Sequence, residues 1–163
     1  MTLSELEAHV DRQLDSNPAL EYVKWGAVVN SATSTADARI EPADDGAFEV
    51  TITPLVRELK IRKEFLSRSE HHDASEKDQV WVRNALWLLD SIERRESTVM
   101  KTIQAIVKIQ HRFVVSGKED DLVPIKMQAI ADEVGLHVTT VSRAVSEKIV
   151  EMPHGLWPLR DGF

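Results

Sequence analysis

The sequence predicts a mainly α fold, in which a long helix precedes a helix-turn-helix and a small β-hairpin wing, with a short helix and another β-hairpin nearer the N-terminus. Three observations predict it. No proline or glycine interrupts residues 76–115, where apolar residues recur at intervals of three, four and seven. Two short amphipathic segments flank Gly135, and two short apolar segments flank Pro153-His154-Gly155.

The first element is a short amphipathic helix. Leu3, Leu6, Val10 and Leu14 form one apolar stripe, and the Asn17-Pro18 pair ends the helix because proline cannot continue it. The stripe has two interpretations. It docks on a partner, which makes Leu6 and Leu14 interface residues, or it packs on its own domain.

A linker and a hairpin follow. Residues 26–38, GAVVNSATSTADA, are small and polar enough for a linker. Strand residues from Ala38, a turn at residues 42–46 and the alternating Phe48, Val50 and Ile52 predict a hairpin. The expected division is an N-terminal helix at 1–25, a linker at 26–38, a region with the long helix at 39–118, and a head with a wing at 119–163.

Residues 76–115 predict one very long helix or two helices joined near Glu93 to Thr98, where the polar ERREST interrupts the apolar stripe. A continuous helix would reach roughly 60 Å at its usual rise. We expect its two halves to pack against different neighbours. Trp81 and Trp87 are expected to be core rather than contact residues.

The segment from Lys126 to Lys148 has the pattern of a helix-turn-helix that reads duplex DNA. Gly135 permits the left-handed turn, and Val138, Val141 and Val145 keep a buried stripe on the second helix. Arginine pairs bidentately with guanine, while hydroxyl groups hold phosphates or touch a thymine methyl. The alternative is a helical hairpin whose polar residues have no such role. The predicted DNA-contacting residues are His137, Thr139, Thr140, Ser142, Arg143 and Lys148.

The tail predicts a second hairpin, from Ile149 to Met152 and from Leu156 to Leu159, which resembles the wing that often flanks a reading helix. Such a wing lies beside DNA or buttresses the core, and Trp157 favours the buttress.

Composition limits the class of protein. The 163 residues carry a net charge of −7 and no cysteine, which excludes disulfides and thiolate metal sites. Neither a signal sequence nor an apolar run of the roughly 20 residues that span a bilayer occurs, so we expect a cytoplasmic protein without a membrane partner. Residues 126–163 carry 4 bases and 5 acids, so the head itself is not basic. A larger partner would have to supply much of its affinity for DNA.

Four passages together resemble the RNA polymerase sigma factors of the sigma-54 (RpoN) type. They are LSELEAHVDRQLDSNPALE, WVRNALWLLDSIERRESTVMKTIQAIVKIQHRFV, MQAIADEVGLHVTTVSRAVSEK and VEMPHGLWPL, with a weaker match in ARIEPADDGAFEVTITPLVRELKIRKEF. They follow the order of the family and cover most of the chain.

The resemblance implies a promoter-recognition subunit that binds core RNA polymerase and places its helix-turn-helix on the downstream promoter element. Arg143 closes the TVSR-like run and is implied as the residue that reads a base. In the family the long helix, with the N-terminal region, holds the closed complex shut until an ATP-driven, enhancer-bound activator remodels it. Trp87 and Arg95 occupy the matching positions, which implies a regulatory role.

The chain departs from the family in two places. The region at 39–118 would be only part of a core-binding domain, and the arginine-rich box that reads the upstream promoter element would be absent after Phe163. We therefore expect a fragment or a naturally reduced paralogue.

Three alternatives compete with this interpretation. A LacI-like repressor head is similar in sequence to ADEVGLHVTTVSR. Such heads normally lie at the N-terminus of their chains, whereas this segment lies near the C-terminus. A polymerase- or sigma-binding competitor without promoter selection would suit the acidic charge. An enzyme would need a constellation that neither His71-His72-Asp73 nor Ser116 and Ser142 provide, so neither catalysis nor a cofactor or metal is expected.

Overall fold

The computed structural model describes residues 3–22, 36–43, 46–53, 59–70 and 75–163. The chain divides into two compact units. The first unit comprises Met1–Asn30 and Pro54–Arg94, and the second comprises Ser31–Thr53 and Arg95–Phe163. One helix, α3 (Glu76–Ile109), contributes its first part to the first unit and its second part to the second. Among the described residues, no helix is both long and apolar enough to cross a bilayer.

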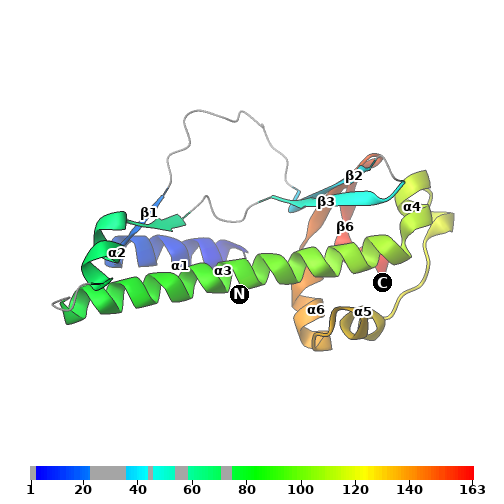
Figure 1. The fold of residues 1–163 in the computed structure, drawn as a ribbon. Coiled ribbons are helices and arrows are strands. Elements are labelled where there is room, and N and C mark those ends of the chain that lie inside the picture. The colour runs from blue at the N-terminus through cyan, green and yellow to red at the C-terminus, as the bar shows by residue number, and fades with distance from the viewer. Residues whose placement is uncertain (1–2, 23–35, 44–45, 54–58, 71–74) are drawn as a thin grey trace. The chain divides into compact units, whose positions relative to one another are not determined.

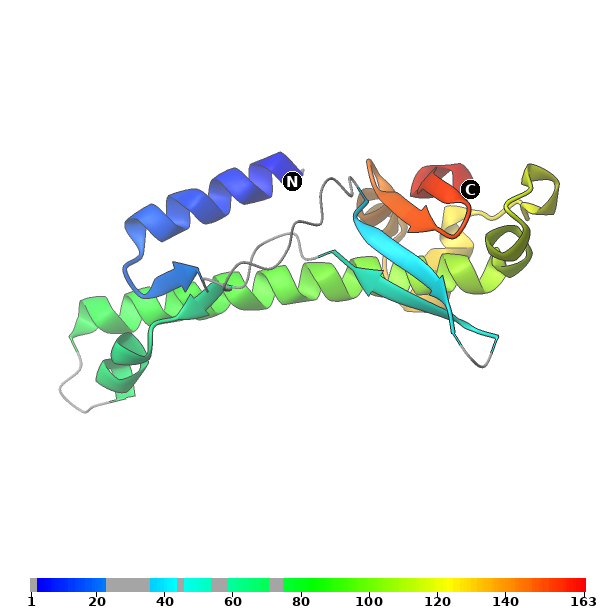
Figure 2. The same cartoon turned by 90° about the horizontal axis from the view of Figure 1, so that it is seen from above.

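The first unit contains three helices and a two-stranded sheet among its described residues. They are α1 (Leu3–Ser16), β1 (Leu20–Tyr22), β4 (Leu59–Ile61), α2 (Lys63–Glu70) and the first part of α3. Val10 of α1 is buried in a cluster with Leu20, Leu59, Ala85 and Leu88, and Figure 2 shows α1 beside the first half of α3. The predicted first helix therefore packs on its own unit.

The expected interface residues of α1 are only partly described. Leu14 is half-buried against the same cluster, whereas the side chain of Leu6 lies outside the described residues. The helix ends as predicted, and the Asn17 side chain adds a buried link. Its amide donates to the Trp81 carbonyl of α3 (2.8 Å), and its oxygen accepts from the Ala19 amide (3.1 Å).

Helix α3 is continuous, so the possible break near Glu93 to Thr98 does not occur (Figure 1). Polar residues there do not interrupt the helix, because exposed helical positions tolerate them and Asp90 pairs with Arg94 one turn later (2.7 Å). The two halves do pack against different clusters, as expected. Trp81 contacts Phe65 edge to face, but Trp87 is 66% exposed, so the expectation of a core position for Trp87 is wrong.

Helix α3 ends at Ile109, short of the predicted end at residue 115, and the next residue, Gln110, is buried. The side-chain amide of Gln110 donates to the carbonyls of Val123 (2.7 Å) and Gly162 (3.0 Å), and its oxygen accepts from the Val123 amide (2.8 Å). One glutamine thereby ties the end of the long helix to the following loop and to the C-terminal segment.

The second unit contains a four-stranded sheet and short helices around the second half of α3. The elements are β2 (Ala38–Pro42), β3 (Phe48–Ile52), α4 (His111–Ser116), a 3₁₀ turn at Glu119–Asp121, α5 (Met127–Val134), α6 (Val138–Val145), β5 (Ile149–Met152), β6 (Gly155–Pro158) and a 3₁₀ turn at Leu159–Gly162. Figure 1 shows the sheet on one side of this half of α3 and α5 and α6 on the other.

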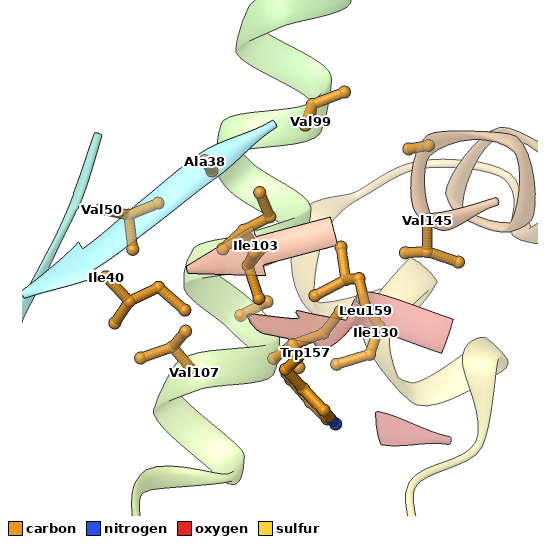
Figure 3. Close-up of a cluster of buried hydrophobic side chains, with 14 of the residues drawn as sticks. Ala38, Ile40, Val50, Val99, Ile103, Val107, Ile130, Val145, Trp157 and Leu159 are labelled. Atoms are coloured by element: carbon orange, nitrogen blue, oxygen red, sulfur yellow. The ribbon is translucent and has the colours of Figure 1, made fainter. Parts of the chain in front are cut away.

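Both predicted hairpins form, and a pairing that was not predicted joins them. The strand order is β3-β2-β5-β6, and the contact between β2 and β5 is parallel, with Ala38 opposite Val150 and Arg39 opposite Glu151. The sheet, α3 and the helix-turn-helix share one core, in which Ile40, Ile103, Ile130, Val145 and Leu159 are fully or almost fully buried (Figure 3).

The C-terminal hairpin buttresses this core. Trp157 is buried against Phe113 of α4, with ring centroids 5.0 Å apart. His154 holds the turn, because its Nε2 donates to the Val115 carbonyl (2.7 Å). Gly117, at φ 66°, leaves room for the imidazole, since a Cβ there would lie 2.7 Å from its ring. The buttress role favoured by Trp157 is therefore the one that the structure shows.

Candidate nucleic-acid interface

The helix-turn-helix begins with α5 and turns at Gly135. Ile130 and Ala131 bury one face of α5. Gly135 adopts the left-handed conformation (φ 67°, ψ 35°), and its amide donates to carbonyls of the last turn. The Leu136 amide then donates to the Ala131 carbonyl (2.9 Å), and its side chain packs against the core. This is the helix-terminating motif that a left-handed glycine permits, so the predicted turn is confirmed.

His137 caps the second helix, α6. Its Nδ1 accepts from the Thr139 amide (3.3 Å) and lies 2.8 Å from the Thr139 hydroxyl. A histidine whose Nδ1 accepts carries its proton on Nε2, which is then a hydrogen-bond donor. His137 and Thr139 are both exposed, so the capped end of α6 offers donors beside the positive end of the helix dipole.

The two faces of α6 are arranged as the sequence predicts. Val141 and Val145 are buried, Ala144 lies beside them, and Val138 is half-buried. Thr139, Thr140 and Arg143 are exposed, while Ser142 is half-buried. In the described part of the chain, Arg143 has neither an ion pair nor a hydrogen bond for its side chain. Its guanidinium is therefore available to a ligand.

The predicted contact between Lys148 and DNA is wrong. It was expected to face DNA, but its side chain is only 6% exposed and its ammonium lies 2.5 Å from the Asp37 carboxylate. A buried ammonium is stable only when it is paired with an opposite charge, and here Asp37 supplies that charge, so the ammonium does not reach the surface. The partner comes from the residue just before β2, which the sequence had placed in a linker. Residues 26–35 of that predicted linker lie outside the described residues.

The junction between α6 and β5 has an unusual backbone. Glu147, between Ser146 and Lys148, has φ 60°, and it is the described non-glycine residue with a positive φ. A glutamate in the left-handed region is uncommon and costs free energy. No pattern in the sequence identifies this residue, because the position lacks a glycine, asparagine or aspartate, the residues that favour a positive φ.

A polar contact ties the head to the long helix. Lys108 of α3 donates to Glu133 of α5 across 2.7 Å. This hydrogen bond, with the attraction between the charges, raises the pKa of Lys108 and lowers the pKa of Glu133. Beside it lies a shallow hollow of about 240 Å³ lined by Lys101, Gln104, Ala105, Lys108, Glu133 and Val134. Both side chains of the ion pair are well exposed, so it contributes little stability.

The other predicted functional residues do not join this surface. Trp87 and Arg95 lie on α3, Trp87 exposed and Arg95 half-buried. The Ser116 hydroxyl donates to Asp121 (2.6 Å), which links the end of α4 to the following 3₁₀ turn. His71, His72 and Asp73 lie outside the described residues.

Comparison with known proteins gives a consistent result. The family described as "Sigma-54, DNA binding domain" matches residues 75–163. The chain is 31% identical to an RNA polymerase sigma-54 factor of Sinorhizobium fredii over 99% of its own length and 31% of that protein. It is 33% identical to the corresponding factor of Rhizobium meliloti strain 1021, over 93% of this chain and 30% of that one. The chain thus spans about a third of these relatives.

A solved structure is similar as well. The structure described as "Crystal structure of Aquifex aeolicus sigmaN bound to promoter DNA" matches with a TM-score of 0.55 and 26% identity, over 86% of this chain and 42% of that one. The residues that match the family contain the long helix, the helix-turn-helix and the wing. Since the family's DNA-binding domain covers more than half of the chain, the protein belongs to the sigma-54 family.

Proposed function

We propose that the protein is a transcription initiation factor of the sigma-54 type, or a part of one, which binds core RNA polymerase and contacts the downstream promoter element through α6. It has no catalytic role of its own, and its place of action is the cytoplasm. The observation that carries the proposal is the exposed face of α6, with Thr139, Thr140 and an unpaired Arg143 among the described residues, inside the segment that matches the family's DNA-binding domain.

Each residue of that face has a chemical role in the proposal. Arg143 donates to guanine in the major groove, since its guanidinium has the fork geometry that matches O6 and N7. His137, Thr139 and Thr140 hold phosphates at the start of α6, where the helix dipole favours an anion. Ser142, half-buried beside Arg143, contributes at the edge of the face. Lys148 is removed from the set because its ammonium is buried.

The charge of the molecule supports a need for polymerase. The chain carries −7, and residues 126–163 carry only 4 bases against 5 acids. Phosphate neutralisation dominates the affinity of most DNA-binding proteins, so this head alone is expected to bind weakly. Polymerase would supply affinity by holding the head close to the promoter.

A regulatory role for α3 forms the finer part of the proposal. Trp87 places a large apolar ring in solvent, which is the type of residue that anchors protein interfaces. Trp87 and Arg95 are proposed to contact the elements that keep the promoter complex closed, on which an ATP-dependent activator would act. Support comes from the exposure of Trp87 and from the positions of both residues on the long helix.

Gel retardation with purified components tests the proposal. The chain and core polymerase together are expected to retard a promoter fragment that neither component retards alone. A matched fragment with a scrambled downstream element should not be retarded. If the pair retards both fragments equally, or neither, promoter selection by this chain is contradicted.

A second candidate is a competitor that binds polymerase or a full-length sigma factor without selecting promoters. The observation that favours it is the exposed apolar surface of Leu86 and Trp87 combined with the acidic charge. In the same experiment a competitor binds polymerase and reduces retardation by a full-length sigma-54 factor, with no retardation of its own. The LacI-like head is not retained, because the comparisons identify the sigma-54 family over the same residues.

A further inference from the structure

Asp37 makes four polar contacts at the junction that follows the reading helix. Its Oδ1 accepts from the Lys148 ammonium (2.5 Å), and its Oδ2 accepts from the Ile149 amide (2.9 Å). Its own amide donates to the Ile149 carbonyl (2.7 Å), and its carbonyl accepts from the Thr53 amide (2.9 Å). The side chains of Lys148 and Asp37 are 6% and 14% exposed. Asp37, just before β2, therefore holds both Lys148 and Ile149, the residues at the start of β5.

Stability alone gives no strong reason for such a pair. Moving two charges out of water costs free energy that their attraction only partly offsets, and an apolar pair of similar volume is often as stable or more so. Charge pairs of this kind have been linked to specifying a single arrangement of the chain. The surroundings require such specification, because Glu147 immediately before Lys148 is held at φ 60°.

These contacts of Asp37 lie close in the sequence to the end of α6, the helix proposed to read DNA. Helix α6 ends at Val145, and only Ser146 and Glu147 separate it from the anchored Lys148. Arg143 lies in the last turn of α6. A binding constellation must be held to about 0.5 Å to be productive, and it relies on neighbouring residues for that accuracy. A shift at the Lys148 anchor would therefore be passed to Arg143 through a short segment.

We propose that Asp37 is a positioning residue for DNA reading: its charge pair with Lys148 sets the orientation of α6 and thereby the base that Arg143 meets. The inference rests on the proposed contact between α6 and promoter DNA. It assigns a role in base discrimination to a side chain that lies far from α6 in the sequence and that is not itself a DNA ligand.

Two variants separate positioning from simple stabilisation. Asp37→Asn keeps an oxygen for the Ile149 amide but leaves the Lys148 ammonium without a charge partner. Adding Lys148→Met removes that charge and retains an unbranched chain of similar length. The double variant should recover most of the thermal stability that Asp37→Asn loses, because no unpaired buried charge remains. The exposed pair Glu21 and Arg62 provides a matched control as Glu21→Gln with Arg62→Met.

The measured quantity is a specificity ratio. Full-length chain with core polymerase is titrated onto the promoter fragment and onto fragments with single base-pair changes in the downstream element. Wild-type protein and the control double variant are expected to share one ratio. Asp37→Asn, and Asp37→Asn with Lys148→Met, are each expected to lower it by ~10-fold, within the range of a single misread base pair. Affinity for the altered fragments should change little.

The outcomes distinguish the inference from the function on which it rests. If wild-type protein with polymerase fails to select the promoter fragment, the proposed function fails first. If wild-type protein selects it and both variants keep its ratio, Asp37 has no positioning role. The inference is also overturned if the double variant recovers both thermal midpoint and ratio, because the pair then acts through stability alone.

Discussion

Arg143 and Gln110 are polar side chains in opposite environments, one exposed and one buried. Arg143 is exposed and has no protein partner among the described residues, so its value lies in what it can bind. Gln110 is 1% exposed and makes three hydrogen bonds, so its value lies in what it satisfies. The two residues accordingly predict different losses on substitution.

Arg143→Ala is expected to weaken binding to the cognate promoter by about 1 to 3 kcal/mol and to relax discrimination at one base pair, because the proposed bidentate contact to guanine would be lost. Competition binding with single base-pair variants measures both effects. An equal loss on every sequence would show that Arg143 holds a phosphate instead. Thr98→Ala or another substitution away from α6 is the control for folding.

Gln110→Leu is expected to lower the free energy of unfolding by about 1 to 3 kcal/mol, because the buried Gly162 carbonyl would lose its partner and two part-buried hydrogen bonds to the Val123 backbone would be lost. Urea denaturation measures this loss. Gln104→Leu is the matched control, since Gln104 lies on the same helix with an exposed side chain and should change stability little. Equal effects of the two substitutions would contradict the role given to the Gln110 hydrogen bonds.

Some side chains are predictable from the sequence and others are not. The faces of α6 were predicted because Val138, Val141 and Val145 recur at helical spacing. Lys148 was misplaced because its environment is created by Asp37, a distant residue that no local pattern connects to it. Gln110 and Glu147 were missed because their roles depend on buried contacts and backbone angles rather than on residue type.

Among the elements, α3 carries two different environments on one uninterrupted helix. The prediction left open whether this stretch forms one helix or two joined near Glu93 to Thr98, and the structure has one continuous helix. Its apolar periodicity predicted the helix itself, and the polar ERREST within that stripe predicted that its two halves pack against different neighbours. The same periodicity did not place Trp87, which is exposed although tryptophan is usually well buried.

Trp87→Ala is expected to change the free energy of unfolding by less than about 0.5 kcal/mol, because the ring is mostly in solvent. Trp81→Ala, on the same helix, is expected to cost clearly more, since Trp81 packs against Phe65. Chemical denaturation of both variants makes the comparison. A Trp87 substitution that weakens polymerase or promoter complexes without loss of stability would support its proposed regulatory contact, and a large loss of stability would contradict its solvent position.

The link between α3 and α5 should depend on pH in a defined direction. The pKa of Glu133 is lowered by its hydrogen bond to Lys108, so its contribution is present above the ordinary carboxyl range and is lost as pH falls through the lowered value. The pKa of Lys108 is raised, so its contribution is present below the ordinary ammonium range and is lost as pH rises through the raised value.

We therefore expect the stability difference between wild-type protein and Lys108→Met to be small and constant near neutral pH, and to vanish in acid. It should also shrink with added salt, because both side chains are exposed. Thermal melts of both proteins across an acidic pH series measure it. A difference that persists unchanged below the carboxyl range would exclude the ion pair as its cause.

For the molecule as a whole, the parallel contact between β2 and β5 was the feature least accessible to sequence reasoning. Each hairpin has a local signal in alternating residues and turn residues, whereas the pairing of two hairpins has none. The mainly α class and the order of elements followed from periodicity. The common sheet depends on contacts between residues near 38 and residues near 150, which the order of elements does not specify.

Residues 75–163, which match the family's DNA-binding domain, are therefore expected not to form a stable fold when produced alone. They would lack β2 and β3, expose the edge of β5 and leave the Lys148 ammonium without Asp37. Residues 31–163 should restore cooperative unfolding. Circular dichroism melts compare the two fragments, and cooperative unfolding of residues 75–163 alone would show that the β2–β5 contact is dispensable.

The β2–β5 contact also fixes when during synthesis the head can mature. Contacts between distant segments form slowly, because the entropy of closing a long loop is lost before the contacts contribute any stability. β2 is made before α3, and its partner strand β5 follows only after α3 and both helices of the head have been made. A nascent chain can thus form helix-turn-helix segments before anything orients them. The head would acquire its final orientation in a single late step, when β5 pairs with a strand that was made before α3.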